Sequence, residues 1–228
     1  MVRSVVASTL LLLFFLITSL NSKPATWKDT VKKVKESVVF VSAAPVEMLD
    51  PFTGTVVKRK PACTGFVIDR VRGLVATAAH CVGHEGLTAE GKDAIIVFSD
   101  PKLDVAIIET DAARRKPELR QQYFGRPDVT LAVAALGYGY DMGKIIYRHG
   151  EISEPGAIWE GESWKEEVGE WITTDFSFVG GMSGGPLFDV EGRVLGIVTQ
   201  SDGKSGWARP ASLVYAQLSP LPFPHLTP

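Results

Sequence analysis

Short runs of β-branched and aromatic residues, separated by Gly, Pro and Asp, dominate the chain from residue 37 onward. Runs of this length and composition are typical of β-strands, and the residues between them are those that turns require. The predicted strands form two series: 38–41, 65–68, 74–77, 94–98 and 105–108, then 131–136, 144–147, 170–174, 186–188 and 194–199. Two such series indicate two antiparallel barrels or sandwiches.

The first 22 residues have the layout of an export signal. A short basic start is followed by an apolar run, residues 4–20, broken only by Ser and Thr. The run is a little short to span a bilayer comfortably, and the residues before Lys23 lack a clean Ala-x-Ala cleavage signature. Residues 1–22 are therefore expected to be either a cleaved signal peptide or an uncleaved membrane anchor. Both alternatives predict a secreted or periplasmic location for the rest of the chain.

The strand series also predicts the domain boundaries. Residues 23–36 form an N-terminal arm, in which apolar and basic residues alternate as in a short amphipathic helix. A polar, charged stretch then interrupts the strands and is the best linker candidate. The predicted units are the first barrel at 37–112, the linker at 113–126, the second barrel at 127–218 and a Pro-rich tail at 219–228.

Composition and charge narrow the class of protein. The chain has 228 residues, 45% hydrophobic and 22% charged, with a formal net charge of −2. The apolar content excludes an intrinsically disordered chain, and the near-neutral charge gives no electrostatic reason to expect a nucleic-acid partner. The acidic stretch 158–169, which carries Trp159 and Trp164, is predicted to be an exposed loop.

Three motifs carry residues suited to nucleophilic catalysis. His80 follows a predicted strand in Thr-Ala-Ala-His-Cys, Asp104 opens another in Leu-Asp-Val-Ala-Ile-Ile, and Ser183 lies in the glycine-rich Gly-Met-Ser-Gly-Gly-Pro. A serine hydroxyl is a weak nucleophile near neutral pH, so Ser183 needs a base such as His80 to accept its proton. Asp93 and Asp100 also lie between His80 and Ser183. Asp104 is preferred because it lies at the mouth of a buried strand.

In this order the motifs resemble those of the chymotrypsin-like (trypsin-like) serine peptidases, whose triad runs His, Asp, Ser along the chain. The resemblance covers nearly all of the chain after the leader. It implies an all-β fold of two antiparallel six-stranded barrels with the active site in the cleft between them. It also implies an oxyanion hole formed by the N–H groups of Gly181 and Ser183, polypeptides as partners, and no cofactor or metal.

The chain has two cysteines, Cys63 and Cys81. A pair of cysteines in an exported protein indicates a disulfide, with two free core thiols as the alternative. In the resembled family a bridge joins the strand before the catalytic His to the residue directly after that His. Cys63 and Cys81 fit that placement.

The residues around Ser183 favour one branch of the family. Met182 stands where digestive peptidases carry an Asp that pairs with a newly released N-terminus, so that mode of activation is excluded. The segment 173–183 instead resembles the HtrA/DegP-type peptidases. Only a short tail follows the predicted second barrel, so the PDZ domain usual in that group is expected to be absent.

The same resemblance implies a specificity pocket. Its residues are Ser177 at the base of S1, Gly206 opposite it, and Thr199, Gln200 and Ser201 in the strand that pairs with the substrate backbone. The base carries no acidic residue, which argues against Lys or Arg at P1. Val198 stands where glutamate-specific relatives carry a His, which argues against Glu. Cleavage is therefore predicted after small or medium apolar residues.

These expectations together predict an exported serine endopeptidase. The alternative from another class is a catalytically silent binding protein with the peptidase fold. An esterase using the same triad is disfavoured, because α/β-hydrolases carry the triad in the order Ser, Asp, His.

Overall fold

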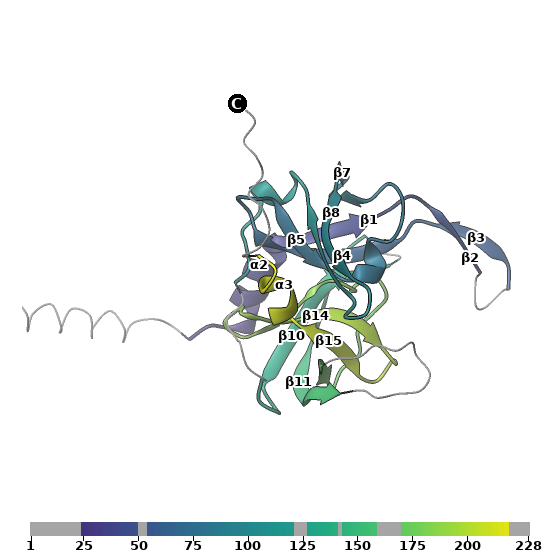
Figure 1. Cartoon of the computed structure of the whole chain (residues 1–228). Helices are drawn as coiled ribbons and strands as arrows, with labels where there is room; N and C mark the ends of the chain where they lie inside the picture. The colour runs from purple at the N-terminus through teal and green to yellow at the C-terminus, as the bar shows by residue number, and fades with distance from the viewer. Residues whose placement is uncertain (1–23, 50–53, 121–126, 141–142, 159–169, 219–228) are drawn as a thin grey trace, which may run out of the picture.

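The structure is a computed structural model of the whole chain and describes residues 24–49, 54–120, 127–140, 143–158 and 170–218 (Figure 1). The expected leader at 1–22, the tail at 219–228, and the acidic stretch beyond residue 158 with its two tryptophans lie outside the described residues. Within the described residues, no helix is both long enough and apolar enough to cross a membrane.

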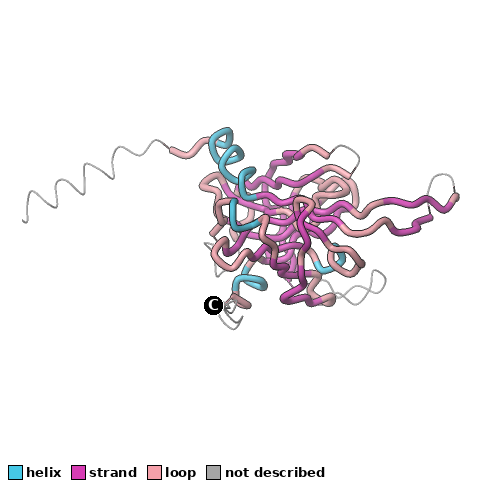
Figure 2. Tube along the Cα trace, turned by 90° about the horizontal axis from the view of Figure 1, so that it is seen from above, coloured by secondary structure: helices cyan, strands magenta, loops and turns pink. Residues whose placement is uncertain are grey.

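The first half of the chain forms a seven-stranded antiparallel sheet in the order β7-β6-β1-β4-β5-β9-β8. Its strands are β1 (Val38–Ser42), β4 (Ala62–Asp69), β5 (Leu74–Thr77), β6 (Thr88–Ala89), β7 (Lys92–Asp93), β8 (Ile95–Asp100) and β9 (Val105–Glu109). Between β1 and β4 the chain forms a separate hairpin of β2 (Val46–Leu49) and β3 (Val56–Arg59), which projects from the body of the molecule (Figures 1 and 2).

The second half forms a closed antiparallel barrel in the order β10-β11-β12-β15-β14-β13. Its strands are β10 (Ala132–Tyr138), β11 (Ile145–Ile158), β12 (Glu170–Thr174), β13 (Pro186–Asp189), β14 (Val194–Ser201) and β15 (Gly206–Pro210). The predicted all-β, double-barrel fold class is thereby confirmed. The first unit differs in detail from a closed six-stranded barrel: it has seven strands, and its end strands β7 and β8 are not paired with each other.

One apolar core joins the two halves. Phe66 of β4 and Ile107 of β9 are fully buried in the same cluster as Leu136 of β10 and Phe188 of β13. Alternate side chains of a strand point to opposite faces, so Val67, next to Phe66, packs in a second cluster within the first sheet. The central strands β4, β5 and β9 are buried on both faces, so their sequences are continuous apolar runs.

Helices play a minor part. The helix α2 (Trp27–Ser37) begins at Thr26, whose hydroxyl oxygen accepts the N–H of Asp29 as an N-cap. Its buried face includes Val34, and the ring of Trp27 packs edge-on against that of Phe188 at 6.3 Å. The expected N-terminal arm is thus largely helix, docked on the second barrel. In the described part of the chain, the remaining helical turns are η1 (Ala79–Cys81), η2 (Ala113–Arg115) and α3 (Ser212–Tyr215).

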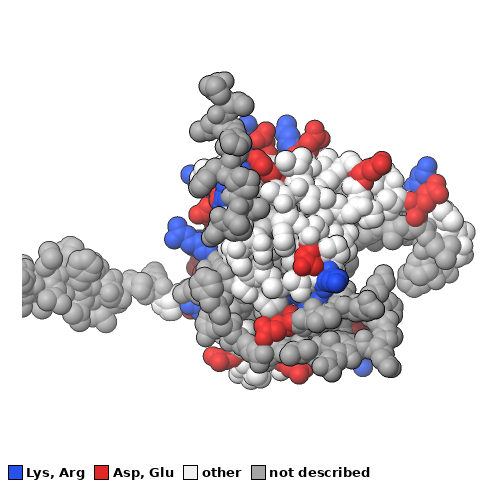
Figure 3. Space-filling view, in the orientation of Figure 1, with Lys and Arg blue, Asp and Glu red and all other residues white. Residues whose placement is uncertain are grey.

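Charged side chains of both signs are interspersed around the rim of the face shown in Figure 3, and its centre is mostly uncharged.

Candidate active site

His80 and Asp104 meet between β5 and β9. His80 lies in the η1 turn directly after β5, and Asp104 directly precedes β9, the neighbour of β5 in the sheet. The His80 Nδ1 atom lies 2.9 Å and 3.0 Å from the two carboxylate oxygens of Asp104, and the backbone N–H of His80 donates to Oδ1 at 3.0 Å. A carboxylate only accepts hydrogen bonds, so Nδ1 is the donor nitrogen of His80. In the neutral imidazole Nε2 is then the accepting nitrogen, which is the tautomer that a general base requires.

Asp104 is the acid that the structure brings to His80. Asp93 is exposed on β7, and Asp100 uses its Oδ1 atom to accept the backbone N–H groups of Lys102 and Leu103. These hydrogen bonds form a turn in the loop that leads to Asp104. Asp104 itself is only 8% exposed.

The backbone of Asp104 has a φ of +50°, in the left-handed region. Asp adopts this conformation more readily than most residues, because its short polar side chain can form local hydrogen bonds. The preceding turn is also contacted from the second barrel, where the buried Arg209 guanidinium donates to the carbonyl oxygen of Lys102 at 3.4 Å. That guanidinium lies 3.4 Å above the centre of the Trp171 ring. The loop that bears Asp104 is therefore contacted by both halves of the fold.

Ser183 lies in a tight loop between β12 and β13. Gly181 has a φ of +96° and Gly184 a φ of +85°, and a Cβ atom on Gly181 would lie 2.5 Å from the carbonyl oxygen of Tyr138. Only glycine fits these positions without strain. The Ser183 hydroxyl donates to the carbonyl oxygen of Thr199 at 3.0 Å.

The peptides that carry the Gly181 and Ser183 N–H groups are fixed by their carbonyls. The Gly180 carbonyl accepts the N–H of Tyr140 at 2.8 Å, and the Met182 carbonyl accepts the N–H of Gly185 at 2.9 Å. Since no described peptide bond is cis, each N–H points away from the carbonyl of its own peptide. The N–H groups of Gly181 and Ser183 are thus directed away from Tyr140 and Gly185, respectively.

Cys63 and Cys81 form a disulfide in the structure, with their Cα atoms 6.0 Å apart. The bridge joins β4 to the residue after His80, and Cys81 Sγ lies 3.8 Å from the carbonyl oxygen of Ser183. A disulfide sulfur has no proton, so this is a packing contact. The two sulfurs also lie within 4.8 Å of a His80 nitrogen, but sulfurs bonded to each other are not thiolate ligands for a metal.

Two of the expected pocket residues, Ser201 and Gly206, contact Phe178, a residue that the sequence did not single out. Phe178 is buried, and a Cβ atom on Gly206 would lie 2.5 Å from its Cε2 atom. The N–H of Phe178 donates to the Ser201 hydroxyl at 3.2 Å, and that hydroxyl donates to Ser205. The space between the Phe178 segment and Gly206 is therefore occupied by an aromatic ring.

The other two residues of the strand expected to pair with the substrate, Thr199 and Gln200, differ in solvent exposure. Thr199 is buried, and its hydroxyl donates to the Trp207 carbonyl at 2.8 Å, whereas the Gln200 side chain is exposed. Asp202 shapes the turn after this strand by accepting the N–H groups of Ser205 and Lys204, and these hydrogen bonds lower the pKa of its carboxyl.

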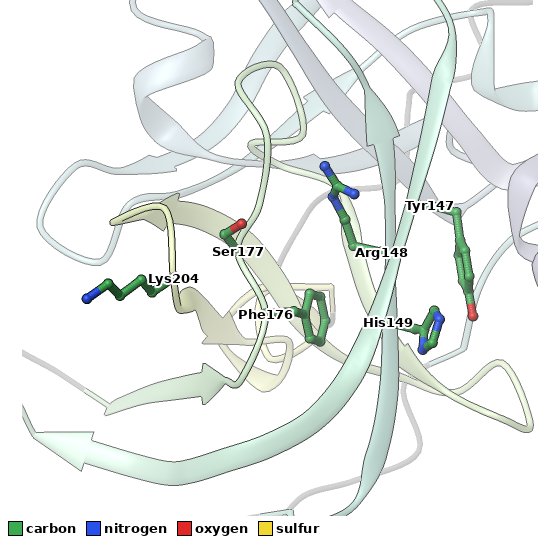
Figure 4. Close-up of a pocket in the computed structure, with 6 residues that line it drawn as sticks. All are labelled: Tyr147, Arg148, His149, Phe176, Ser177 and Lys204. Atoms are coloured by element: carbon green, nitrogen blue, oxygen red, sulfur yellow. The ribbon is translucent and has the colours of Figure 1, made fainter.

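Ser177 faces a cavity of about 580 Å³ on the second barrel (Figure 4). Ser177 and Arg148 extend into the space between β11 and the segment 176–178, and Tyr147 and His149 lie on the other side of β11. The remaining lining residues are Phe176 and Lys204. The lining contains none of His80, Asp104 and Ser183, so this cavity is not formed by the candidate triad residues.

Residues 63–197 match the family model of the trypsin-like peptidase domain, and the chain belongs to that family. The match begins at Cys63 in β4, contains all three candidate triad residues and ends halfway along β14. The predicted membership of the trypsin-like serine peptidases is confirmed.

Curated relatives are proteases of the HtrA type. The chain is 26% identical over 197 residues to the pro-apoptotic serine protease NMA111 of Lodderomyces elongisporus, covering 78% of this chain and 19% of that protein. It is 25% identical over 193 residues to the serine endoprotease DegS of Salmonella typhimurium, covering 82% of this chain and 52% of DegS. The chain thus spans a fifth to a half of the length of these two relatives.

Solved structures agree with the fold. The active form of the Rv3671c protease from M. tuberculosis is 27% identical, with a TM-score of 0.69, and the match covers 86% of this chain and 85% of that one. The serine endoprotease from Yersinia pestis, 23% identical with a TM-score of 0.67 over 88% of this chain and 68% of that one, shows the same fold.

Proposed function

We propose that the chain is an exported serine endopeptidase that hydrolyses peptide bonds through Ser183, His80 and Asp104. The observation that carries the proposal is the pair of contacts between His80 Nδ1 and the Asp104 carboxylate, at 2.9 Å and 3.0 Å. This pair fixes the orientation of the His80 ring and, in the neutral imidazole, makes Nε2 the accepting nitrogen that a general base uses. Membership of the trypsin-like peptidase family supports the same chemistry.

In the proposed reaction His80 Nε2 takes the Ser183 proton while Oγ attacks the scissile carbonyl carbon. The carbonyl π electrons move to oxygen, and the N–H groups of Gly181 and Ser183 stabilise the resulting oxyanion. The C–N bond then breaks, and His80 donates its proton to the leaving amine, which leaves an acyl-enzyme. A water molecule, deprotonated by His80, attacks the ester and releases the acid and Ser183.

Substrate preference is proposed to be for a small apolar P1 residue. The Phe178 ring against Gly206 supports this preference, because it fills the space that a large P1 side chain would enter. The absence of an acidic side chain at Ser177, the expected base, is consistent with the exclusion of Lys and Arg at P1. Polypeptides are the proposed partners.

Export is proposed from the apolar run at 4–20, which leaves signal peptide and membrane anchor as alternatives. The disulfide between Cys63 and Cys81 supports an oxidising compartment, secreted or periplasmic, because disulfides are rare where thiols are kept reduced.

A fluorophosphonate probe tests the activity. The wild-type chain should be labelled covalently at Ser183, and Ser183→Ala should not be labelled, with both variants unfolding at the same urea concentration. A folded, disulfide-bonded wild-type chain that resists labelling and cleaves no peptide would refute the proposal and favour a catalytically silent binding protein.

A further inference from the structure

Thr64 of β4 is fully buried where the first sheet meets the loop that carries Ser183. Its N–H donates to the carbonyl oxygen of Ser183 at 2.8 Å, and its hydroxyl donates to that of Gly181 at 2.7 Å. The same hydroxyl accepts the N–H of Tyr138, on β10, at 2.8 Å. Its carbonyl oxygen accepts the Thr77 hydroxyl at 2.7 Å. Thr64 therefore links both sheets to the loop, and every one of its polar groups has a hydrogen-bond partner.

Four consecutive carbonyls, from Gly180 to Ser183, accept hydrogen bonds, and Thr64 supplies two of the four donors. These hydrogen bonds matter most at Gly181, because a glycine with a φ of +96° has no side chain to restrict the rotation of its peptides. The peptide after Gly181 is held by the Thr64 hydroxyl. The peptide before it is held by Tyr140.

The Thr64 hydroxyl also acts on the peptide before Gly181, through Tyr138. By accepting the Tyr138 N–H, the hydroxyl fixes the end of β10 two residues before Tyr140. Tyr140 in turn donates to the Gly180 carbonyl, whose peptide carries the Gly181 N–H. One hydroxyl therefore restrains Gly181 from both sides.

We propose that Thr64 is a positioning residue whose hydroxyl sets the orientation of the Gly181 N–H toward the oxyanion. The proposal rests on the proposed peptidase function, in which that N–H stabilises the transition state. Thr64 acts through Gly181 and does not contact the substrate. A buried polar group that is fully hydrogen-bonded is suited to such a role, because it favours one backbone arrangement over the others.

Thr64→Val tests the proposal, since it removes the hydroxyl, keeps the branched shape and leaves the backbone N–H to Ser183 intact. A misdirected oxyanion donor lowers kcat, so we expect a loss of about 10²-fold in kcat with KM changed by less than about threefold. Thr64→Ser retains the hydroxyl and should restore kcat to within about threefold of wild type.

Thr110→Val is the matched control. Thr110 is also buried in the first half of the chain, and its hydroxyl accepts the N–H of Ala112 at 3.3 Å, so the variant loses one hydrogen bond of a buried threonine. It should lower the urea midpoint by less than Thr64→Val, which loses two hydrogen bonds, and leave kcat unchanged. Equal kcat in Thr64→Val and wild type, or equal losses in Thr64→Val and Thr110→Val, would overturn the proposal while leaving the peptidase function intact.

An activity-independent measurement separates the two proposals. In ¹⁵N–¹H spectra of the full chain, Thr64→Val should shift the Gly181 amide resonance, and Thr64→Ser should leave it near its wild-type position. If the wild type is not labelled by a fluorophosphonate, the proposed function fails, and this spectrum still decides whether Thr64 orients Gly181. An unchanged Gly181 resonance in Thr64→Val would refute the positioning role.

Discussion

Ser183 and Thr199 are joined by a hydrogen bond of 3.0 Å, in which the serine hydroxyl donates to the backbone carbonyl. A hydroxyl has one proton, so Ser183 cannot donate it to His80 at the same time. Thr199 belongs to the strand expected to pair with the substrate backbone, where an N–H of the substrate would compete for this carbonyl. Substrate binding is then expected to release the Ser183 hydroxyl to His80.

This relationship predicts a large kinetic effect of a small change in the substrate. A peptide substrate methylated at the P1 amide nitrogen cannot donate to Thr199, so we expect kcat to fall at least about tenfold, the value of one hydrogen bond. The control is methylation at P2, because successive N–H groups of an extended peptide point in opposite directions. Equal effects of the two methylations on kcat would contradict the prediction.

The roles of the acidic residues predict a sharp contrast between two Asp→Asn variants. Asp104→Asn should lower kcat by about 10³- to 10⁴-fold, because the amide does not hold His80 in the required tautomer. Asp93→Asn changes an exposed carboxylate on β7 that does not contact His80, and its kcat should stay at the wild-type value. Steady-state kinetics on folded samples measures both, and a comparable loss in Asp93→Asn would refute the assignment.

The strands were predictable where a run of apolar residues is buried on both faces, as in β4, β5 and β9. The strand β15 was not predictable from the sequence, because it begins with Gly206 and ends with Pro210, residues that disfavour strands. It forms because closure of the barrel supplies β12 and β14 as partners. The strand β11 is longer than its pattern predicts, and it continues past Gly150 and Pro155 through two irregularities in its pairing with β12.

The candidate site likewise contains residues that the sequence predicts and residues that it does not. His80, Asp104 and Ser183 lie in local motifs, so their neighbours in the sequence predict them. Thr64 and Phe178 could not be predicted in this way, because their contacts are formed only in the folded chain. Thr64 is 117 residues from Gly181 in the sequence, and the contact of Phe178 with Gly206 joins two separate segments of the second barrel. The Cys-Thr-Gly sequence at Thr64 contains no signal for a hydroxyl shared between two sheets.

Phe178 is predicted to limit the size of the P1 side chain. Phe178→Ala should raise kcat/KM for substrates with Leu or Phe at P1 relative to those with Ala, because it vacates the space against Gly206. Removing a buried aromatic ring also destabilises the fold, by about 3 kcal/mol or more. The control is Phe176→Ala, which removes the edge-on partner of Phe178 but not the ring against Gly206. An unchanged ranking of P1 residues in Phe178→Ala would refute the assignment.

The disulfide is predicted to stabilise the fold. Replacing Cys63 and Cys81 together by Ala should lower the free energy of unfolding by about 3 kcal/mol, because the bridge closes a loop with a sequence separation of 18 and so restricts the unfolded chain. Urea denaturation of the double variant and of the reduced wild type measures the loss. The two samples should agree, and an unchanged unfolding midpoint in both would contradict the prediction.

Tyr138 is predicted to make the fold sensitive to alkaline pH. Partial burial and the nearby Glu90 carboxylate, whose Oε1 lies 3.4 Å from the hydroxyl, raise the pKa of Tyr138 to about 12. The folded state therefore holds this proton more tightly than the unfolded state, whose phenol titrates near 10. The stabilisation is complete below pH 10 and is lost as pH rises through 12, because the unfolded chain loses its proton first.

Urea midpoints at pH 9 and pH 11.5 test this dependence. Tyr138→Phe should lose less stability than the wild type between the two pH values, because it has no phenol to ionise. The loss of stability in Glu90→Gln should lie between those of the wild type and Tyr138→Phe. This variant removes the nearby charge but leaves the Tyr138 ring partly buried beside Phe40. Phenolate absorbance during a pH titration of the folded chain gives a second measure, in which Tyr138→Phe should lack one late-titrating group. Equal alkaline losses in Tyr138→Phe and wild type would show that ionisation of Tyr138 does not limit stability at high pH.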